Sequence, residues 1–257
     1  MNEHDLADLA YAKSLLENPG LAAKITSLLG TPIEKGFALL PRNWSQMVTV
    51  GTRKALAVAI EAAVLTLDKR TGRTSSDFLH KFLVAASGAG GGFFGLPALS
   101  VELPVSTTIM MRSIADIARS EGEAICDPQT KMACIEVFAL GGPGSRDDAA
   151  ETGYFAVRAA LSKAVSDAAE YIARRGIIEE GAPAIVRLIA QIASRFGVQV
   201  SEKVAAQAIP VIGAAGGSIL NTLFMDHFQD MARGHFIVRR LESRYGREEV
   251  RRLYRTL

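Results

Sequence analysis

The sequence predicts an all-α protein, a multi-helix bundle of about ten helices, from three observations. Apolar residues make up 49% of the chain but aromatic residues only 7%, so the apolar content is mainly alanine, leucine, valine and isoleucine. Apolar residues recur at helical spacing along most of the sequence. No stretch shows the strong alternation of apolar and polar residues that is typical of a half-buried strand.

The N-terminal residues, 1–44, are expected to form a small helical arm in front of a helical domain over 45–257. Within the arm, helices are expected over 3–17 and 21–29, and a loop over 36–43. This division treats the arm as a peripheral addition to the domain.

The helical domain is expected to begin with a long helix over 44–70, whose apolar residues follow helical spacing. A second helix should run from Asp77 into a glycine-rich stretch, and Pro104 should be the first residue of the next helix. Ser201 is expected to cap a later glycine-containing helix. Further helices are expected over 128–140, 147–175, 177–196, 223–245 and 247–257.

Two apolar segments with glycines, 82–111 and 204–225, are each about the length of a membrane-spanning helix. Their small residues are spaced so that two helices could approach closely in a bilayer, although a tightly packed soluble core would use the same spacing. Prolines and polar residues interrupt both segments, which favours re-entrant or interfacial helical hairpins over a full span. The residues expected at these helix-packing or membrane contacts are Gly88, Gly92, Gly95, Gly213, Gly217 and Asn221.

The stretch GGFFGLPALSVELPVSTTIMMRSIADIARSEGE, residues 91–123, joins a glycine run, two proline-containing corners and the ELP and RSIADIA elements in one order. Together with KMACIEVFALGG at 131–142 and the block at 208–246, it resembles the EcsC family of bacteria over about residues 45–250. The resemblance implies a mostly helical bacterial protein near the cytoplasmic membrane. The family takes its name from a gene beside the two parts of an ABC transporter, so a transporter is one expected partner. It carries no cofactor or catalytic residue to this chain.

Glu102 is the most distinctive single residue, because it lies in an otherwise uncharged stretch just before Pro104. A buried carboxylate there could act as an acid or base, or it could cap the helix that begins near Pro104. The structural role is favoured, and Arg112 or another basic group is a possible ion-pair partner for Glu102.

Asp226 and His227 belong to a His/Asp cluster with Asp230 and His235. The two histidines do not have the spacing of a zinc-binding HExxH motif, so no metal is expected, and solvated or helix-pairing side chains are the preferred interpretation. The glycine runs lack the preceding strand and the following Lys-Ser/Thr of a phosphate-binding loop, so no cofactor is expected.

The net charge is only +2, and no nucleic-acid-binding motif occurs, so nucleic acid is not an expected partner. Charge is concentrated from residue 233 to the end of the sequence, where there are eight arginines and three glutamates. Such a tail could form ion pairs along a helix surface or attract anionic lipid. The arginines expected to contact anionic lipid are Arg239, Arg240, Arg244, Arg251 and Arg252.

These features predict a non-enzymatic, membrane-associated accessory protein on the cytoplasmic side of the bacterial inner membrane, peripheral or partly inserted. The alternative is a soluble helical protein with an apolar pocket that binds or hydrolyses a lipid-like ligand, with Glu102, Asp226 and His227 as its polar residues. Two cysteines make no disulfide framework, and the N-terminal residues do not resemble a secretory signal, so a reducing cytoplasm is expected.

Overall fold

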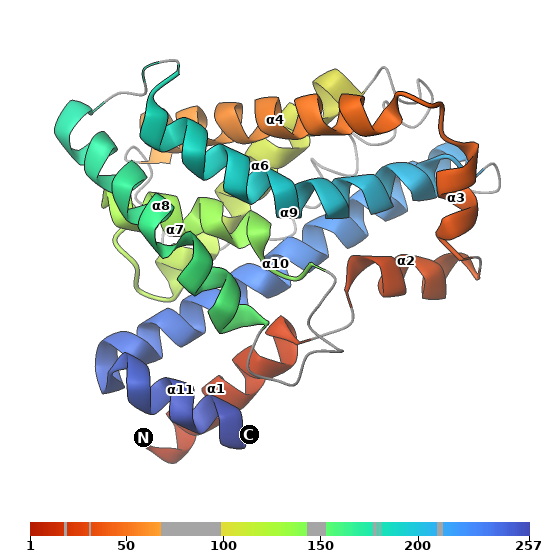
Figure 1. The fold of residues 1–257 in the computed structure, drawn as a ribbon. Helices are drawn as coiled ribbons and strands as arrows, with labels where there is room; N and C mark the ends of the chain where they lie inside the picture. Colours follow the sequence, from red (N-terminus) through yellow and green to blue (C-terminus); the bar gives the residue numbers. More distant parts are fainter. Residues whose placement is uncertain are drawn as a thin grey trace.

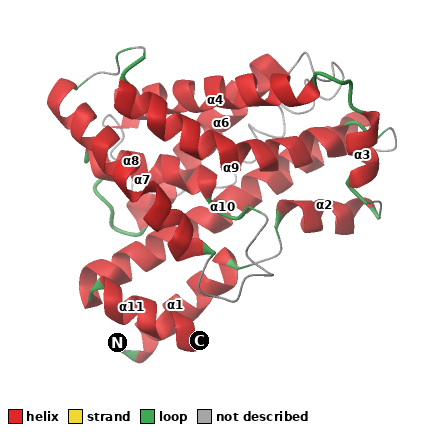
Figure 2. Ribbon diagram, in the orientation of Figure 1, coloured by secondary structure: helices red, strands yellow, loops and turns green. Residues whose placement is uncertain are grey.

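The computed structural model describes residues 1–17, 20–30, 32–67, 99–142, 153–176, 179, 181–209 and 213–257. The described residues form ten α-helices and no strand, which confirms the predicted all-α bundle (Figures 1 and 2). The helices are α1 Glu3–Leu16, α2 Leu21–Leu29, α3 Glu34–Leu39, α4 Trp44–Thr66, α6 Leu99–Ser120, α7 Pro128–Glu136, α8 Tyr154–Arg175, α9 Pro183–Gln207, α10 Gly213–Tyr245 and α11 Arg247–Thr256. A short 3₁₀ turn, Val137–Ala139, extends α7.

Local sequence accounts for several of these boundaries. The side chain of Asn2 accepts a hydrogen bond from the backbone of Asp5 at the start of α1. Asp127 caps α7 in the same way, and Pro128 occupies the first helical position, where a missing N–H has no cost. Between α10 and α11, Gly246 has a φ of 86°, a conformation that glycine adopts without strain.

The longest of the described helices, α10, crosses the molecule (Figure 1). It contacts α1, α2, α6, α9 and α11. Helix α4 packs against both α6 and α9, and α7 packs against α8. Four phenylalanines fill the space between the 3₁₀ turn, α9 and α10, with ring centroids 5.0 to 6.0 Å apart; they are Phe138, Phe196, Phe224 and Phe228. This aromatic cluster is the centre of the hydrophobic core.

The N-terminal arm shares that core. Leu9 and Ala12 of α1 are fully buried, and α1 packs along α10 (Figure 1). In α3, Gly36 lies directly against the backbone of α9, where an added Cβ would stand 2.0 Å from the carbonyl oxygen of Ala205. The arm is therefore held by the same buried cluster as the helices that follow it.

Three local predictions were wrong. Gly36 belongs to helix α3 rather than to a loop, because its missing side chain permits the close approach to α9. Ser201 lies inside α9, where its hydroxyl donates a hydrogen bond to the carbonyl of Gly197. Pro104 lies inside α6, which begins at Leu99. Packing of the buried Leu103 holds that first turn in place despite the N–H that the proline lacks.

No helix in the described part of the chain is both long and apolar enough to cross a membrane. The segment 204–225 is divided between the end of α9 and the start of α10, so it is not one continuous helix. In α10, Gly213 is the first residue, and Gly217 and Asn221 are buried. Gly88, Gly92 and Gly95 lie outside the described residues, as does the helix expected from Asp77.

Candidate functional site

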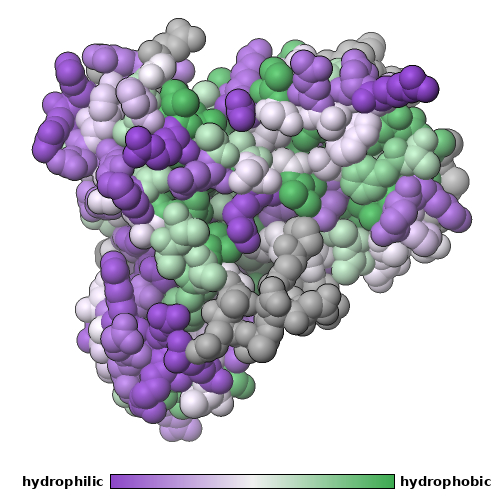
Figure 3. Space-filling view, in the orientation of Figure 1, coloured by the Kyte–Doolittle hydropathy of each residue, from purple (hydrophilic) through white to green (hydrophobic). Residues whose placement is uncertain are grey.

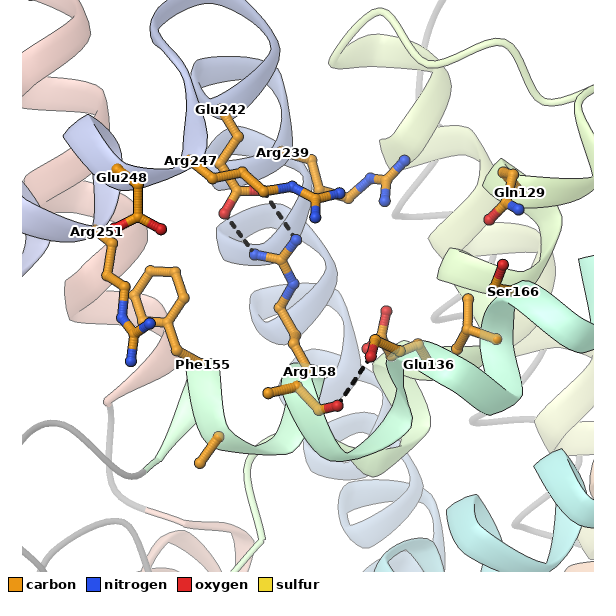
Figure 4. A pocket seen from close by; sticks show the side chains of 14 residues that line it. Gln129, Glu136, Phe155, Arg158, Ser166, Arg239, Glu242, Arg247, Glu248 and Arg251 are labelled. Carbon is orange, nitrogen blue, oxygen red and sulfur yellow. Dashed lines mark hydrogen bonds and ion pairs between the residues drawn. The ribbon is translucent and has the colours of Figure 1, made fainter.

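A pocket of about 700 Å³ lies among α7, α8, α10 and α11 (Figure 4). Its volume falls within the range of small-molecule sites in proteins. The charged side chains that line it come from all four helices: Glu136, Arg158, Arg239, Glu242, Arg247, Glu248 and Arg251. We call this site the arginine pocket.

The helices place these side chains for simple geometric reasons. Arg239 and Glu242 lie three residues apart and so share one face of α10. Arg247 and Arg251 lie four residues apart and share one face of α11. The turn at Gly246 directs α11 away from the line of α10, so that its arginines come to face α8 (Figure 4).

Two of the four arginines are fixed by carboxylates. Arg158 donates two hydrogen bonds to Glu242, at 2.9 and 2.8 Å, and this bidentate pair joins α8 to α10 (Figure 4). Arg239 bonds Glu123, with 2.7 Å between Nε and Oε1. Burial raises the pKa of Glu123, but the hydrogen bond and the positive charge of Arg239, together with a hydrogen bond from Thr130, outweigh it, and the net shift is downward.

The other two arginines are available for a ligand. In the part of the chain that the structure describes, neither Arg247 nor Arg251 forms an ion pair with a carboxylate. Arg251 instead lies over the ring of Phe155, with its guanidinium carbon 5.8 Å from the ring centroid (Figure 4). Both arginines are exposed at the pocket.

Glu136 differs from the other carboxylates of the pocket. Its side chain is only 6% exposed, and no described side chain forms a hydrogen bond with it. Burial raises the pKa of Glu136 to about 7, although the nearby Arg158 and Arg239 oppose the shift. The carboxyl group can therefore exist in its protonated form near neutral pH and donate a hydrogen bond.

Behind Glu136, two further polar side chains lead into the core. The Nε2 atom of His235 is 4.0 Å from the Glu136 carboxylate, and its Nδ1 atom is 3.0 Å from the hydroxyl of Tyr154. Burial lowers the pKa of His235 well below its ordinary value, so the imidazole is neutral. The buried chain Glu136–His235–Tyr154 thus has one end at the pocket wall.

The arginines that were expected to contact lipid have different environments. Arg239 and Arg251 line the arginine pocket. The other three form ion pairs: Arg240 with Asp8, Arg244 with Asp5, and Arg252 with Glu249, at 2.7, 2.8 and 2.7 Å. The first two of these pairs attach α1 to α10.

Glu102 lies elsewhere, in a buried ion pair with Lys203, at 2.7 Å between Oε1 and Nζ. The expected basic partner exists, but it is Lys203 rather than Arg112, and the side chains of the pair are 6% and 1% exposed. The lysine Nζ also lies 5.2 Å from the ring centroid of Phe224. This pair connects α6 to α9, and Glu102 lies inside α6 rather than before a helix that begins near Pro104.

His227 is also packed between helices rather than solvated. Its ring is 1% exposed, lies 3.4 Å from the side-chain nitrogen of Gln199, and fits against Gly141. Burial, with a smaller effect from Lys24, lowers the pKa of His227 to about 3. Asp226 is partly exposed beside it on α10. Among the described residues, no group of three or more His, Cys, Asp or Glu side chains could hold a metal ion.

Four residues of the pocket were not among the candidate site residues predicted from the sequence: Glu136, Arg158, Glu242 and Arg247. One signal could have indicated Glu136: it is the only acidic residue in the mostly apolar run 131–140. The structure shows that every residue of that run is buried. Arg158 and Glu242 are 84 residues apart and carry no such signal. Their pairing becomes visible only when α8 and α10 are packed together.

The fold and the pocket define an all-helical protein with an arginine-lined site between its last helices. The model of the EcsC protein family matches residues 6–241, and the chain belongs to this family. The match includes most of the N-terminal arm, which the resemblance in the sequence did not reach, and ends before α11. Searches of the curated proteins and of the solved structures found no match.

Proposed function

We propose that this protein is a non-enzymatic accessory protein that attaches to the membrane surface by binding anionic lipid headgroups where α10 meets α11. The observation that carries the proposal is the pair of exposed arginines on α11, Arg247 and Arg251, which have no carboxylate partner in the described part of the chain. A basic residue close to an anionic leaflet contributes about 1 kcal/mol of attraction.

The character of the surface supports electrostatic attachment. Figure 3 shows mainly hydrophilic side chains over the lower part of the molecule, where Figure 1 places α1 and α11. A polar surface with unpaired arginines suits contact with headgroups rather than insertion into hydrocarbon. Contact through the glycine-rich segment 82–111 stays a separate prediction, because residues 82–98 of that segment lie outside the described part.

The alternative of an apolar lipid-binding pocket is less well supported. The arginine pocket is lined by four arginines and three glutamates, which suits a charged group better than an acyl chain. Glu102 and His227, the polar residues of that alternative, have separate buried partners in Lys203 and Gln199.

Sedimentation with lipid vesicles tests the proposal. The protein should bind vesicles that contain anionic lipid, should not bind neutral vesicles, and should be released by high salt. The double substitution Arg247→Gln and Arg251→Gln should abolish most of the binding. A matched control is Arg174→Gln with Arg175→Gln, which removes the same charge at the far end of α8.

Fractionation of bacterial membranes gives the complementary test. Release by a salt wash would agree with surface attachment through arginines. Retention through both a salt wash and a carbonate wash would contradict it and indicate inserted apolar segments. Equal binding of anionic vesicles by the α11 double variant and the α8 control would contradict the proposed role of Arg247 and Arg251.

A further inference from the structure

We propose that the arginine pocket binds a terminal phosphate group, a phosphomonoester, between Arg247 and Arg251 of α11 and Glu136 of α7. This inference rests on the proposed function, because it names the headgroup class that would bind where α10 meets α11.

The pocket has the size for the charged end of a small molecule. Four helices line a volume of about 700 Å³, enough for a phosphate and the small polar group that carries it. A phosphodiester continues on both sides of its phosphorus and would need two exits, whereas a phosphomonoester presents three terminal oxygens. A terminal phosphate can therefore meet donors on facing walls.

The arginines divide into two that are fixed and two that can bind. Arg158 and Arg239 are held by Glu242 and Glu123, and these pairs keep their guanidinium groups at the wall. Arg247 and Arg251 have no carboxylate partner among the described residues. Because guanidinium groups match phosphate oxygens in bidentate geometry, these two would make the direct contacts.

The remaining charges favour an anion. Arg158 is paired with Glu242 and Arg239 with Glu123, so among the described residues that line the pocket Glu248 and Glu136 are the carboxylates not paired with Arg158 or Arg239. Glu248 is exposed, and solvent screens its charge. Glu136 lies on the opposite wall, buried, and no side chain in the described part of the chain donates a hydrogen bond to it. As a protonated carboxyl group it would donate a hydrogen bond to the third phosphate oxygen instead of repelling it.

This geometry makes binding depend on pH. Glu136 is faced by Arg158 on α8 and by Arg239, Glu242 and His235 on α10. Since the pKa of Glu136 is raised to about 7, a higher pH removes the proton that the phosphate needs. The second ionisation of a phosphomonoester has a pKa near 6 and is nearly complete at about pH 7, so a fall in affinity above pH 7 should come from Glu136.

Calorimetric titration of the full chain with glycerol 3-phosphate tests the site directly. We expect saturable binding that Arg251→Gln weakens about tenfold to a hundredfold. Arg252→Gln is the matched control on α11, because Arg252 is paired with Glu249 and does not line the pocket; its affinity should be unchanged. The glutamine in Glu136→Gln keeps a hydrogen-bond donor but cannot ionise. This variant should therefore bind glycerol 3-phosphate with an affinity that does not fall above pH 7.

Vesicles distinguish a lipid source of the phosphate from a soluble one. Phosphatidic acid carries a phosphomonoester and phosphatidylglycerol a phosphodiester, and the two are compared at matched surface charge. Preference for phosphatidic acid, with glycerol 3-phosphate competing, would support a lipid headgroup in the pocket. Binding of glycerol 3-phosphate without vesicle binding would support the site, assign it a soluble ligand and contradict the proposed function.

Two results would overturn the inference. Equal binding to both anionic lipids with no binding of glycerol 3-phosphate would remove the phosphomonoester site and leave surface attachment standing. A loss of affinity above pH 7 that persists in Glu136→Gln would contradict the proposed hydrogen bond from Glu136 to the phosphate. Circular dichroism of each variant confirms that the fold is retained, and the pH profile of the unaltered protein tests the inference without any substitution.

Discussion

The carboxyl group of Glu136 should make the free energy of unfolding depend on pH. Burial raises the pKa of Glu136 to about 7 from the 4.5 of an exposed glutamate. Between these two values the unfolded chain releases a proton that the folded protein keeps. The contribution of Glu136 to the free energy of unfolding therefore falls as the pH rises from 4.5 to 7, and it is constant above pH 7.

Glu136→Gln should remove this penalty. Urea denaturation should give a free energy of unfolding that is higher than that of the unaltered protein by about 2–3 kcal/mol at pH 8, with the difference disappearing near pH 4. A difference that stays the same across this range would contradict the assigned pKa. Glu202, whose pKa burial also raises to about 7, is unchanged in both proteins and so cancels in the comparison.

The buried pair of Glu102 and Lys203 gives a second prediction at the level of the residue. Lys203→Met leaves a carboxylate in the core without its cation, so it should destabilise the protein by about 3–5 kcal/mol. Adding Glu102→Gln should restore part of this loss, because the isolated charge is then gone. A double-mutant cycle by chemical denaturation measures the coupling, and additive effects of the two substitutions would argue against the pair.

At the scale of the element, replacing two helical glycines by alanine should change the stability of the protein in opposite directions. At Gly36 in α3, an added Cβ would stand 2.0 Å from the carbonyl oxygen of Ala205, so Gly36→Ala should push α3 away from α9. We expect a loss of about 1–3 kcal/mol of stability. Thermal denaturation should show a lower midpoint for this variant.

Gly197 in α9 is the matched control. An added Cβ there meets no atom within 4 Å, so the substitution should affect stability only through the better helix propensity of alanine. Gly197→Ala should raise stability by about 0.5–1 kcal/mol. If both substitutions stabilised the protein, the close packing of α3 on α9 would be wrong.

At the scale of the whole molecule, α1 is held to α10 by buried polar contacts as well as by apolar ones. Asp5 is 1% exposed and accepts hydrogen bonds from Arg244 and Tyr245, at 2.8 and 2.6 Å. The bond from Tyr245 lowers the pKa of Asp5, and burial only partly opposes this. The aspartate therefore stays ionised in the folded protein.

Asp5→Ala should release α1 while the rest of the bundle stays closed. Hydrogen exchange should show protection in α1 falling roughly tenfold to a hundredfold, with α4 and α6 unchanged. Glu3→Ala, an exposed acid in the same helical turn, is the control and should have little effect. Equal loss of protection in all helices would mean that α1 unfolds only together with the whole molecule.

The helices could largely be predicted from the sequence, because apolar spacing and turn residues act locally. The predicted ranges 3–17, 21–29 and 247–257 agree with α1, α2 and α11 to within a residue or two. The failures came from tertiary packing: Gly36 belongs to a helix because of its contact with α9, and Pro104 stays in a helix because of the core around it.

The arginine pocket could be predicted only in part. The concentration of arginines near the C-terminus drew attention to Arg239 and Arg251, which do line it. The sequence could not separate these from Arg240 and Arg244, because their acidic partners lie more than 230 residues away in α1. Charge along a chain indicates where arginines gather, but the fold decides which of them already have a carboxylate.

The contact between α1 and the end of α10 also has a consequence for synthesis on the ribosome. Asp5 and Arg244 are 239 residues apart. At 5–20 residues per second, α1 leaves the ribosome roughly 10 to 50 s before the helix that covers it. During that interval Leu9 and Ala12 have no surface to bury against, which makes the nascent chain a substrate for chaperones that hold exposed apolar segments. Although α1 is made long before the end of α10, it therefore reaches its final place only after that end has been made.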